Sequence, residues 1–187
     1  MTIIGDTHAD YEQYLKIIES ADESIQVGDF GVGFSDQTPQ LPSQHKFIRG
    51  NHDDPMLCKQ HPNYLGDYGI YKNIFYMSGA HSIDLQTRTP GLDWWPEEEL
   101  SMRELYMAYN LYINHKPTTV ITHDAPYTAL IAMGVFDARS RTNEILEQMF
   151  EIHKPKLWIC GHHHRSFRET IEGTQFICLN INEALEL

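Results

Sequence analysis

Residues 1–8 read MTIIGDTH, a short apolar run that ends in a glycine, an aspartate and a histidine. Four later stretches likewise place Asp, Asn or His after an apolar run: SIQVGD at 24–29, KFIRGNHD at 46–53, TTVITHD at 118–124 and KLWICGHHH at 156–164. Short apolar runs bounded by polar residues predict buried β-strands. The sequence therefore predicts five strands that each end in a block of metal-binding side chains.

Helical patterns separate these strands, which predicts an α/β fold. An amphipathic pattern with Asp10 as N-cap predicts a helix over residues 11–20. A capping box at residues 101–104 opens a helix to about residue 114, and a third helix is expected over 142–153. Further strands are expected over residues 68–77, 81–85, 167–171 and 175–181, the last two as a hairpin. Since ligands in such folds gather at the carboxyl ends of strands, the blocks should meet at one edge.

Two of the blocks hold residues at a spacing of two. Asp6 and His8 form one such pair, and His162 and His164 form the other. In an extended chain, residues at this spacing point to the same side. Each pair is therefore expected to face the site together, while His163 points away.

Length and charge narrow the classes of function. The chain has 187 residues and a formal net charge of −12. Because the blocks span most of this length, we expect a single domain over residues 1–187. Tight binding to long nucleic acid needs a basic surface, so no stable non-specific nucleic-acid binding is expected. Small anionic substrates stay compatible, because bound divalent ions would add positive charge to an acidic pocket.

The sequence also favours a cytoplasmic location. The three cysteines, Cys58, Cys160 and Cys178, are odd in number and have no CxxC spacing, so reduced and buried thiols are expected. The first residues run directly into the first block without the pattern of a signal peptide. No apolar run is long enough for a transmembrane helix, and we expect no membrane association.

In order, the five blocks resemble the motifs of the calcineurin-like metallophosphoesterase superfamily. Those motifs read GDxH, GDxxG, GNHD or GNHE, a strand-ending His, and GHxH. The resemblance implies a four-layer α/β/β/α sandwich in which two mixed sheets face each other. It also implies a metal site at the carboxyl-terminal ends of the strands.

Two divalent metal ions per chain are implied by the resemblance, with Asp29 as the bridging ligand. The ligand set of one ion would be Asp6, His8, Asp29 and His164. The set of the other would be Asp29, Asn51, His123 and His162. Nitrogen and oxygen donors without thiolate suit Mn, Fe, Zn, Co or Ni and do not choose among them. Two adjacent ions can clamp a phosphate and activate a bridging water or hydroxide as the nucleophile.

The resemblance assigns the remaining catalytic roles by motif position. His52 has no place among the ligands, and the matching family histidine acts as a general acid or orients the phosphate; we assign it to the leaving group. His52 and the bridging Asp29 are therefore the predicted catalytic residues. Arg49 precedes the third block, as in protein serine/threonine phosphatases, and is assigned to substrate binding together with Asn51.

One position departs from those phosphatases. Val32 stands where they carry the aspartate that backs the catalytic histidine. Asp53 and Asp54 are the candidate replacements. Arg88 lies in a loop-like stretch from which it could contact phosphate, but a solvated surface position is the expectation.

Together these features predict a dinuclear metal-dependent phosphoester hydrolase that acts on a small phosphoester or nucleotide. Both phosphodiesterase and phosphomonoesterase activity fit the motifs. A protein serine/threonine phosphatase is the alternative, which Arg49 supports and Val32 opposes. The acidic charge disfavours a nuclease. A non-catalytic metal-binding scaffold is disfavoured because all seven ligands and His52 are present.

Overall fold

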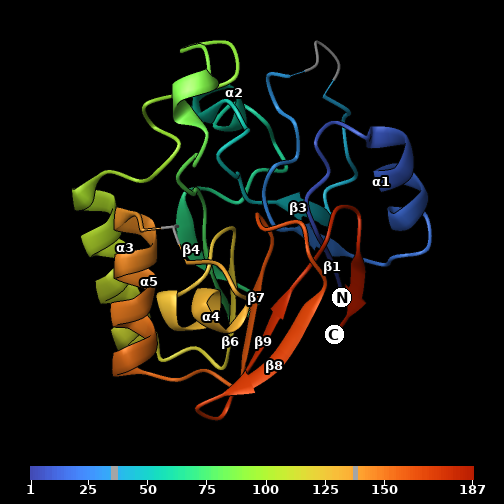
Figure 1. Cartoon of the computed structure of the whole chain (residues 1–187). Coiled ribbons are helices and arrows are strands. Elements are labelled where there is room, and N and C mark those ends of the chain that lie inside the picture. Colours follow the sequence, from blue (N-terminus) through green and yellow to red (C-terminus); the bar gives the residue numbers. More distant parts are fainter. Residues whose placement is uncertain (35–37, 137–138) are drawn as a thin grey trace.

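Two mixed β-sheets form the centre of the protein in a computed structural model that describes residues 1–34, 38–136 and 139–187 (Figure 1). The smaller sheet has the order β10-β1-β2-β3, with bounds Ala184–Glu186, Thr2–Ile4, Ser24–Gln26 and His45–Phe47. The larger sheet has the order β4-β5-β6-β7-β9-β8, with bounds Tyr68–Tyr71, Ile74–Met77, Thr119–Thr122, Leu157–Cys160, Thr174–Cys178 and Phe167–Ile171. Antiparallel pairing involves the edge strands, where β10 pairs with β1, β4 with β5, and β8 with β9.

Helices cover the outer face of each sheet. Helix α1 (Tyr11–Ile18) packs on the smaller sheet, and the short α2 (Pro55–Cys58) adds Cys58 to the same cluster. Helices α3 (Met102–His115), α4 (Tyr127–Ala132) and α5 (Arg141–Ile152) pack on the larger sheet (Figure 1). The predicted α/β/β/α sandwich is thereby confirmed.

Alternation along the strands explains the layers. On β6, Val120 faces the helices and Ile121 faces the other sheet; on β7, Trp158 and Ile159 do the same. Ile3 of the smaller sheet joins Ile121 and Ile159 in the cluster between the sheets. Because these strands are buried on both faces, their central residues are consecutive apolar residues rather than apolar residues alternating with polar ones.

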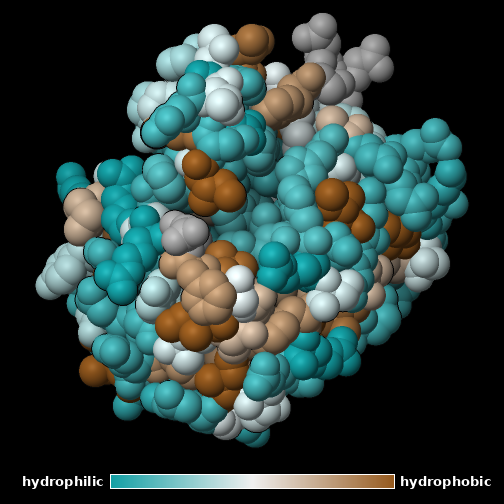
Figure 2. Space-filling model, in the orientation of Figure 1, coloured by the Kyte–Doolittle hydropathy of each residue, from teal (hydrophilic) through white to brown (hydrophobic). Residues whose placement is uncertain are grey.

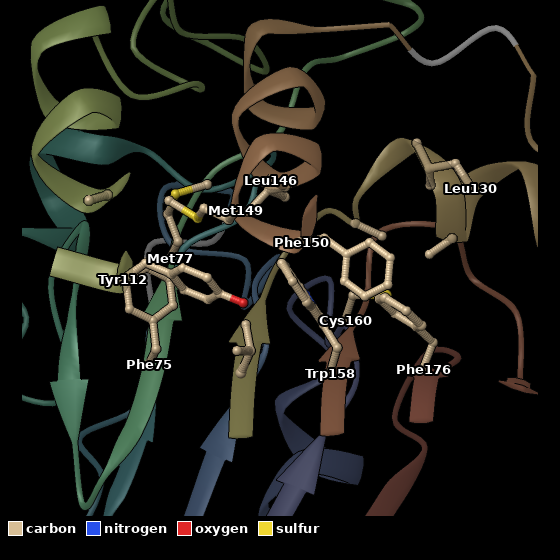
Figure 3. Packing of buried hydrophobic residues seen from close by; sticks show 14 of the residues in the cluster. Phe75, Met77, Tyr112, Leu130, Leu146, Met149, Phe150, Trp158, Cys160 and Phe176 are labelled. Atoms are coloured by element: carbon tan, nitrogen blue, oxygen red, sulfur yellow. The ribbon is translucent and has the colours of Figure 1, made fainter. Parts of the chain in front are cut away.

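Aromatic rings fill the space between the larger sheet and α5. Phe176 stacks on Trp158 with ring centroids 5.7 Å apart, and Phe150 meets Phe176 edge-on at 5.1 Å (Figure 3). All three side chains are nearly inaccessible to solvent. This packing fixes β7 and β9 against a helix, and β7 leads directly into the GHHH block.

The middle of the chain differs from the prediction. Residues 68–77 form a hairpin rather than one strand, because Lys72 and Asn73 both adopt left-handed φ angles, of 47° and 69°. Such a pair matches the twist of two-residue hairpin turns. Residues 81–85 form no strand; the segment continues as a loop with the 3-10 helix η1 (Leu85–Thr87). The edge strand β10 was not predicted.

Predicted boundaries are confirmed where caps are strong. The Asp10 side chain accepts from the Gln13 N–H at the start of α1, and Ser101 and Glu104 form the expected capping box of α3.

Within the described residues, every helix is too short or too polar to cross a lipid bilayer. The surface is hollowed near the middle of the face in Figure 2, and the residues around this hollow are mostly hydrophilic.

Candidate metal centre

The predicted ligands all lie on loops just beyond strands. Those that follow β1, β2 and β3 of the smaller sheet are Asp6, His8, Asp29 and Asn51. Those that follow β6 and β7 of the larger sheet are His123, His162 and His164. Because the sheets face each other, these loops converge, and both sheets contribute to one cluster.

Asp6, His8, Asp29 and His164 form the first group, with their ligand atoms within 4.8 Å of one another. The Nε2 atoms of His8 and His164 lie only 2.8 Å apart. His164 Nε2 is 3.1 Å from Asp6 Oδ2, and His8 Nε2 is 3.8 Å from Asp29 Oδ2. Two carboxylates and two imidazoles thus point at one small volume.

Asp29, His123 and His162 form the second group, again within 4.8 Å. His123 Nε2 is 3.4 Å from Asp29 Oδ1 and 3.2 Å from Asn51 Oδ1. The other ring nitrogen, Nδ1, lies 2.9 Å from the Val27 carbonyl oxygen, which fixes the ring and leaves Nε2 facing the group.

Asp29 joins the two groups through its two carboxylate oxygens. Oδ1 accepts the His52 N–H at 2.8 Å and faces His123, whereas Oδ2 faces His8. Oδ2 is buried and has no hydrogen-bond partner among the described residues. A buried carboxylate oxygen without a donor is costly unless a cation neutralises it. The donor set therefore fits a pair of divalent ions that share Asp29.

The electrostatics of the cluster also favour bound cations. Burial disfavours the charged ring of His123, but Asp29 and Asp6 outweigh it and raise the His123 pKa to about 10. A hydrogen bond to Asp6 likewise raises the pKa of His164. The buried carboxylates thus attract positive charge into this volume, which bound ions would supply.

Glycines allow the blocks to approach so closely. A Cβ atom on Gly50 would lie 2.0 Å from Asp29 Oδ1, and one on Gly161 would lie 2.1 Å from Asp6 Oδ1. Both contacts are far below van der Waals distance, so only glycine fits beside these carboxylates.

The ligand loops are strained rather than extended. His8, Asp29, His162 and His164 have φ angles of 47°, 55°, 64° and 48°. Such left-handed conformations are costly for non-glycine residues and cluster at functional sites. Asp6 and His8 lie in one group, and His164 and His162 lie in the first and second groups, as the two predicted ligand sets place them. The extended conformation expected for each pair was wrong, because His8, His162 and His164 have left-handed φ angles.

A protein-family model matches most of this chain. The model of the calcineurin-like phosphoesterases matches residues 1–166, most of the chain and all five blocks. The chain belongs to the calcineurin-like phosphoesterase family. Members of this family are generally metal-dependent phosphoester hydrolases.

A solved structure of another protein has a similar overall fold. The protein TT1561 of Thermus thermophilus superimposes with a TM-score of 0.52 over 96% of this chain and 89% of its own. The two sequences are 12% identical, so this likeness concerns the fold alone. No curated protein matches the chain at a significant level.

A cavity of about 360 Å³ opens beside the two groups, lined by Asp29, Asn51 and His52 among others. His52 lies at hydrogen-bond distance from Arg88, whose Nη1 and Nη2 are 2.8 and 3.0 Å from the two ring nitrogens. Burial lowers the pKa of His52; the charge of Asp29 opposes this, and that of Arg88 adds to it. The predicted catalytic histidine therefore faces the cavity with an arginine, not a carboxylate, as its neighbour.

Neither candidate replacement for the missing aspartate contacts His52. The carboxylate of Asp53 accepts the N–H groups of Phe30, Gly31, Val32 and Gly50 at 2.7–3.1 Å. Asp54 caps α2. Val32 itself packs in the apolar cluster under α1, so its position could not supply a polar partner. Asp53 thus ties the second block to the third.

Asn51 is oriented by residues that sequence reasoning missed. Its Nδ2 donates to Ser82 Oγ at 3.0 Å, which turns Oδ1 toward His123. The hydroxyl and N–H of Ser82 both donate to the buried carboxylate of Glu98, the N–H at 3.0 Å. No motif marks these two residues, because they stand in the irregular segment between β5 and α3.

Arg49 does not line the cavity. Arg49 is 2% exposed, and its guanidinium donates to Asp67 Oδ1 at 2.9 Å and to the Glu98 carbonyl at 2.7 Å. Burial opposes the charge of Arg49, but Tyr64 and Asp67 together outweigh it and raise the pKa of Arg49. This placement gives Arg49 a structural role and does not support its assignment to substrate binding.

His163 also differs from its expected orientation. Rather than pointing away, it lines the cavity, and its Nε2 lies 3.1 Å from Asp124 Oδ1. Although burial opposes the charge of Asp124, hydrogen bonding and nearby histidines hold its carboxyl pKa well below the usual range. The pair links the fourth and fifth blocks directly.

Proposed function

We propose that this chain is a phosphoester hydrolase that uses two divalent metal ions and acts on a small phosphoester or nucleotide. The observation that carries the proposal is Asp29, whose two buried oxygens face two separate groups of nitrogen and oxygen ligands. The proposed ions are Mn, Fe, Zn, Co or Ni, held by Asp6, His8, Asp29, Asn51, His123, His162 and His164. When bound, such ions supply Lewis acidity and a nucleophile derived from water.

The residues around the cavity support roles on the substrate. His52 lies within 5.3 Å of His8, measured between ring centroids, and lines the same cavity as Asp29. It is therefore placed to contact the phosphoryl group or the leaving oxygen. The cavity volume of about 360 Å³ suits a small phosphoester. Phosphomonoester and phosphodiester substrates both fit this description.

The alternative functions have less support. The support for a protein serine/threonine phosphatase came from Arg49, but this residue is buried and lies away from the cavity. The net charge of −12 opposes a nuclease that tracks long duplexes. Convergence of the whole ligand set and His52 opposes a scaffold without activity.

We also propose the cytoplasm as the location, because Cys58, Cys160 and Cys178 are buried free thiols. The single domain stays a prediction.

Hydrolysis of a nitrophenyl monoester and a bis-nitrophenyl diester, by protein loaded with Mn, Ni, Co or Zn, tests the proposal. We expect turnover of at least one ester. His52→Ala should lower kcat by about 10²–10⁴-fold while two ions stay bound, because only the acid–base or orienting group is lost. His115→Ala, at the exposed end of α3, is the matched control and should change neither value. Two bound ions without turnover of either ester would refute the proposal.

A further inference from the structure

The irregular segment between β5 and α3 carries a cation into the cavity beside the metal ligands. Arg88 stands just after η1, and its side chain is 14% exposed. It lines the same cavity as Asp29, Asn51 and His52. The expected surface position of Arg88 was therefore wrong: the segment folds back over the carboxyl ends of the strands.

The guanidinium of Arg88 is held in one orientation. Nε donates to Asp84 Oδ1 at 2.8 Å and Nη2 to Asp84 Oδ2 at 2.7 Å, a two-point pairing. Nη1 also lies 3.3 Å from the Asp93 carbonyl oxygen. A guanidinium fixed on its Nε side keeps its remaining N–H groups directed at one place, so little entropy is lost when it binds an anion.

The remaining N–H groups of Arg88 point at His52, which lines the cavity. Both Nη atoms lie within 3.0 Å of the ring nitrogens of His52. A guanidinium offers only donors, and an imidazole can accept through one nitrogen at most. At least one N–H group of Arg88 beside His52 is therefore left without an acceptor there, and it can donate to an anionic oxygen in the cavity.

Arg49, the arginine that the motif comparison assigned to substrate, lies outside the cavity lining, with Nε donating to Asp67 and Nη1 to the Glu98 carbonyl. The other arginine that lines the cavity is Arg165, whose Nη1 donates to the Met133 carbonyl at 2.6 Å. Arg88 is thus the described arginine that lies both in the cavity and against His52.

We propose that Arg88 binds the terminal oxygens of the substrate phosphoryl group, and that Asp84 is the positioning residue that orients it. This inference rests on the proposed phosphoester hydrolysis and names the side chain that recognises its anionic group. The recognised chemistry is a tetrahedral phosphate with an unesterified oxygen, so the product, inorganic phosphate, should bind in the same way.

Titration of metal-loaded protein with inorganic phosphate tests the proposal independently of turnover. We expect Arg88→Gln to weaken phosphate binding by about 10- to 100-fold, the effect of losing a charge-assisted hydrogen-bond pair. Metal content and melting temperature should stay at the wild-type values. Arg88→Lys keeps the charge and should recover part of the affinity, whereas Asp84→Ala should weaken binding less than Arg88→Gln does.

The matched control is Arg168→Gln, because Arg168 is exposed on β8 and should not affect phosphate binding. Phosphate affinity of Arg88→Gln equal to that of the wild type would overturn the inference, as would a metal-loaded wild type that binds no phosphate. Kinetic assays then separate the two proposals. A wild type that binds phosphate through Arg88 but hydrolyses neither ester would refute the proposed function and leave the role of Arg88 intact.

Discussion

The amide of Asn51 shows how a single side chain of the site is oriented. An amide can turn either its oxygen or its nitrogen toward a metal, and only the oxygen is a good ligand. Ser82 accepts from Nδ2 and donates its own hydroxyl proton to Glu98, which leaves Oδ1 facing His123. If an ion binds here as proposed, the quality of Asn51 as its ligand would therefore depend on Ser82 and Glu98, which orient the amide.

Ser82→Ala should weaken the binding of one of the two ions by about 10- to 100-fold, because partners that orient a ligand contribute on this scale. The change removes the acceptor of Asn51 Nδ2 while the Ser82 N–H still donates to Glu98. Competition with a chelating dye measures the two affinities. Ser166→Ala is the control, since that hydroxyl bonds Glu183 at the exposed end of β8. If Ser82→Ala bound both ions as tightly as Ser166→Ala does, the role of Ser82 would be contradicted.

At the scale of elements, the strands and helices match the sequence-based prediction where the apolar runs and cap residues are clear. The apolar runs before the five blocks became β1, β2, β3, β6 and β7. The hairpin at residues 68–77 was missed because Lys72-Asn73 is a less familiar turn pair than Asn-Gly, although both residues adopt the required φ. The strand expected at 81–85 failed because Ser82 bonds Glu98 instead of a neighbouring strand.

The cap of α3 gives a prediction about stability alone. Ser101→Ala should lower the free energy of unfolding by about 1 kcal/mol, since it removes the acceptor for the Glu104 N–H. Urea denaturation measures the change. Ser101→Asp should restore most of the loss, because aspartate caps equally well. We expect ester hydrolysis to be unaffected, and a large loss of activity would show that α3 influences the site.

At the scale of the whole molecule, the candidate metal centre joins the two sheets. The smaller sheet supplies Asp6, His8, Asp29 and Asn51, and the larger supplies His123, His162 and His164. Ions bound between them would crosslink layers that otherwise meet through the apolar cluster around Ile3, Ile121 and Ile159. Metal binding and global stability should therefore be coupled.

Removing the ions should lower the melting temperature of the entire protein in one transition. A ligand at 100 times its Kd adds about 2.7 kcal/mol to the free energy of unfolding. Calorimetry with and without a chelator measures the shift. Asp29→Asn removes the shared charge, so added metal should stabilise that variant much less. A wild type that melts at the same temperature with two ions bound and with none would contradict the coupling.

The sequence by itself predicted the family, the strand ends and the set of candidate ligands on which the proposed reaction rests, because these depend on short local patterns. It also excluded a polar partner at Val32. Only the tertiary structure decided which side chains surround His52. Arg49 is only three positions from His52 in the sequence but forms a buried pair with Asp67, whereas Arg88 is 36 positions away and lies against His52. The physical reason is that a buried charge must find a counter-charge or hydrogen-bond acceptor, and those partners are set by packing between distant segments rather than by neighbours in the chain.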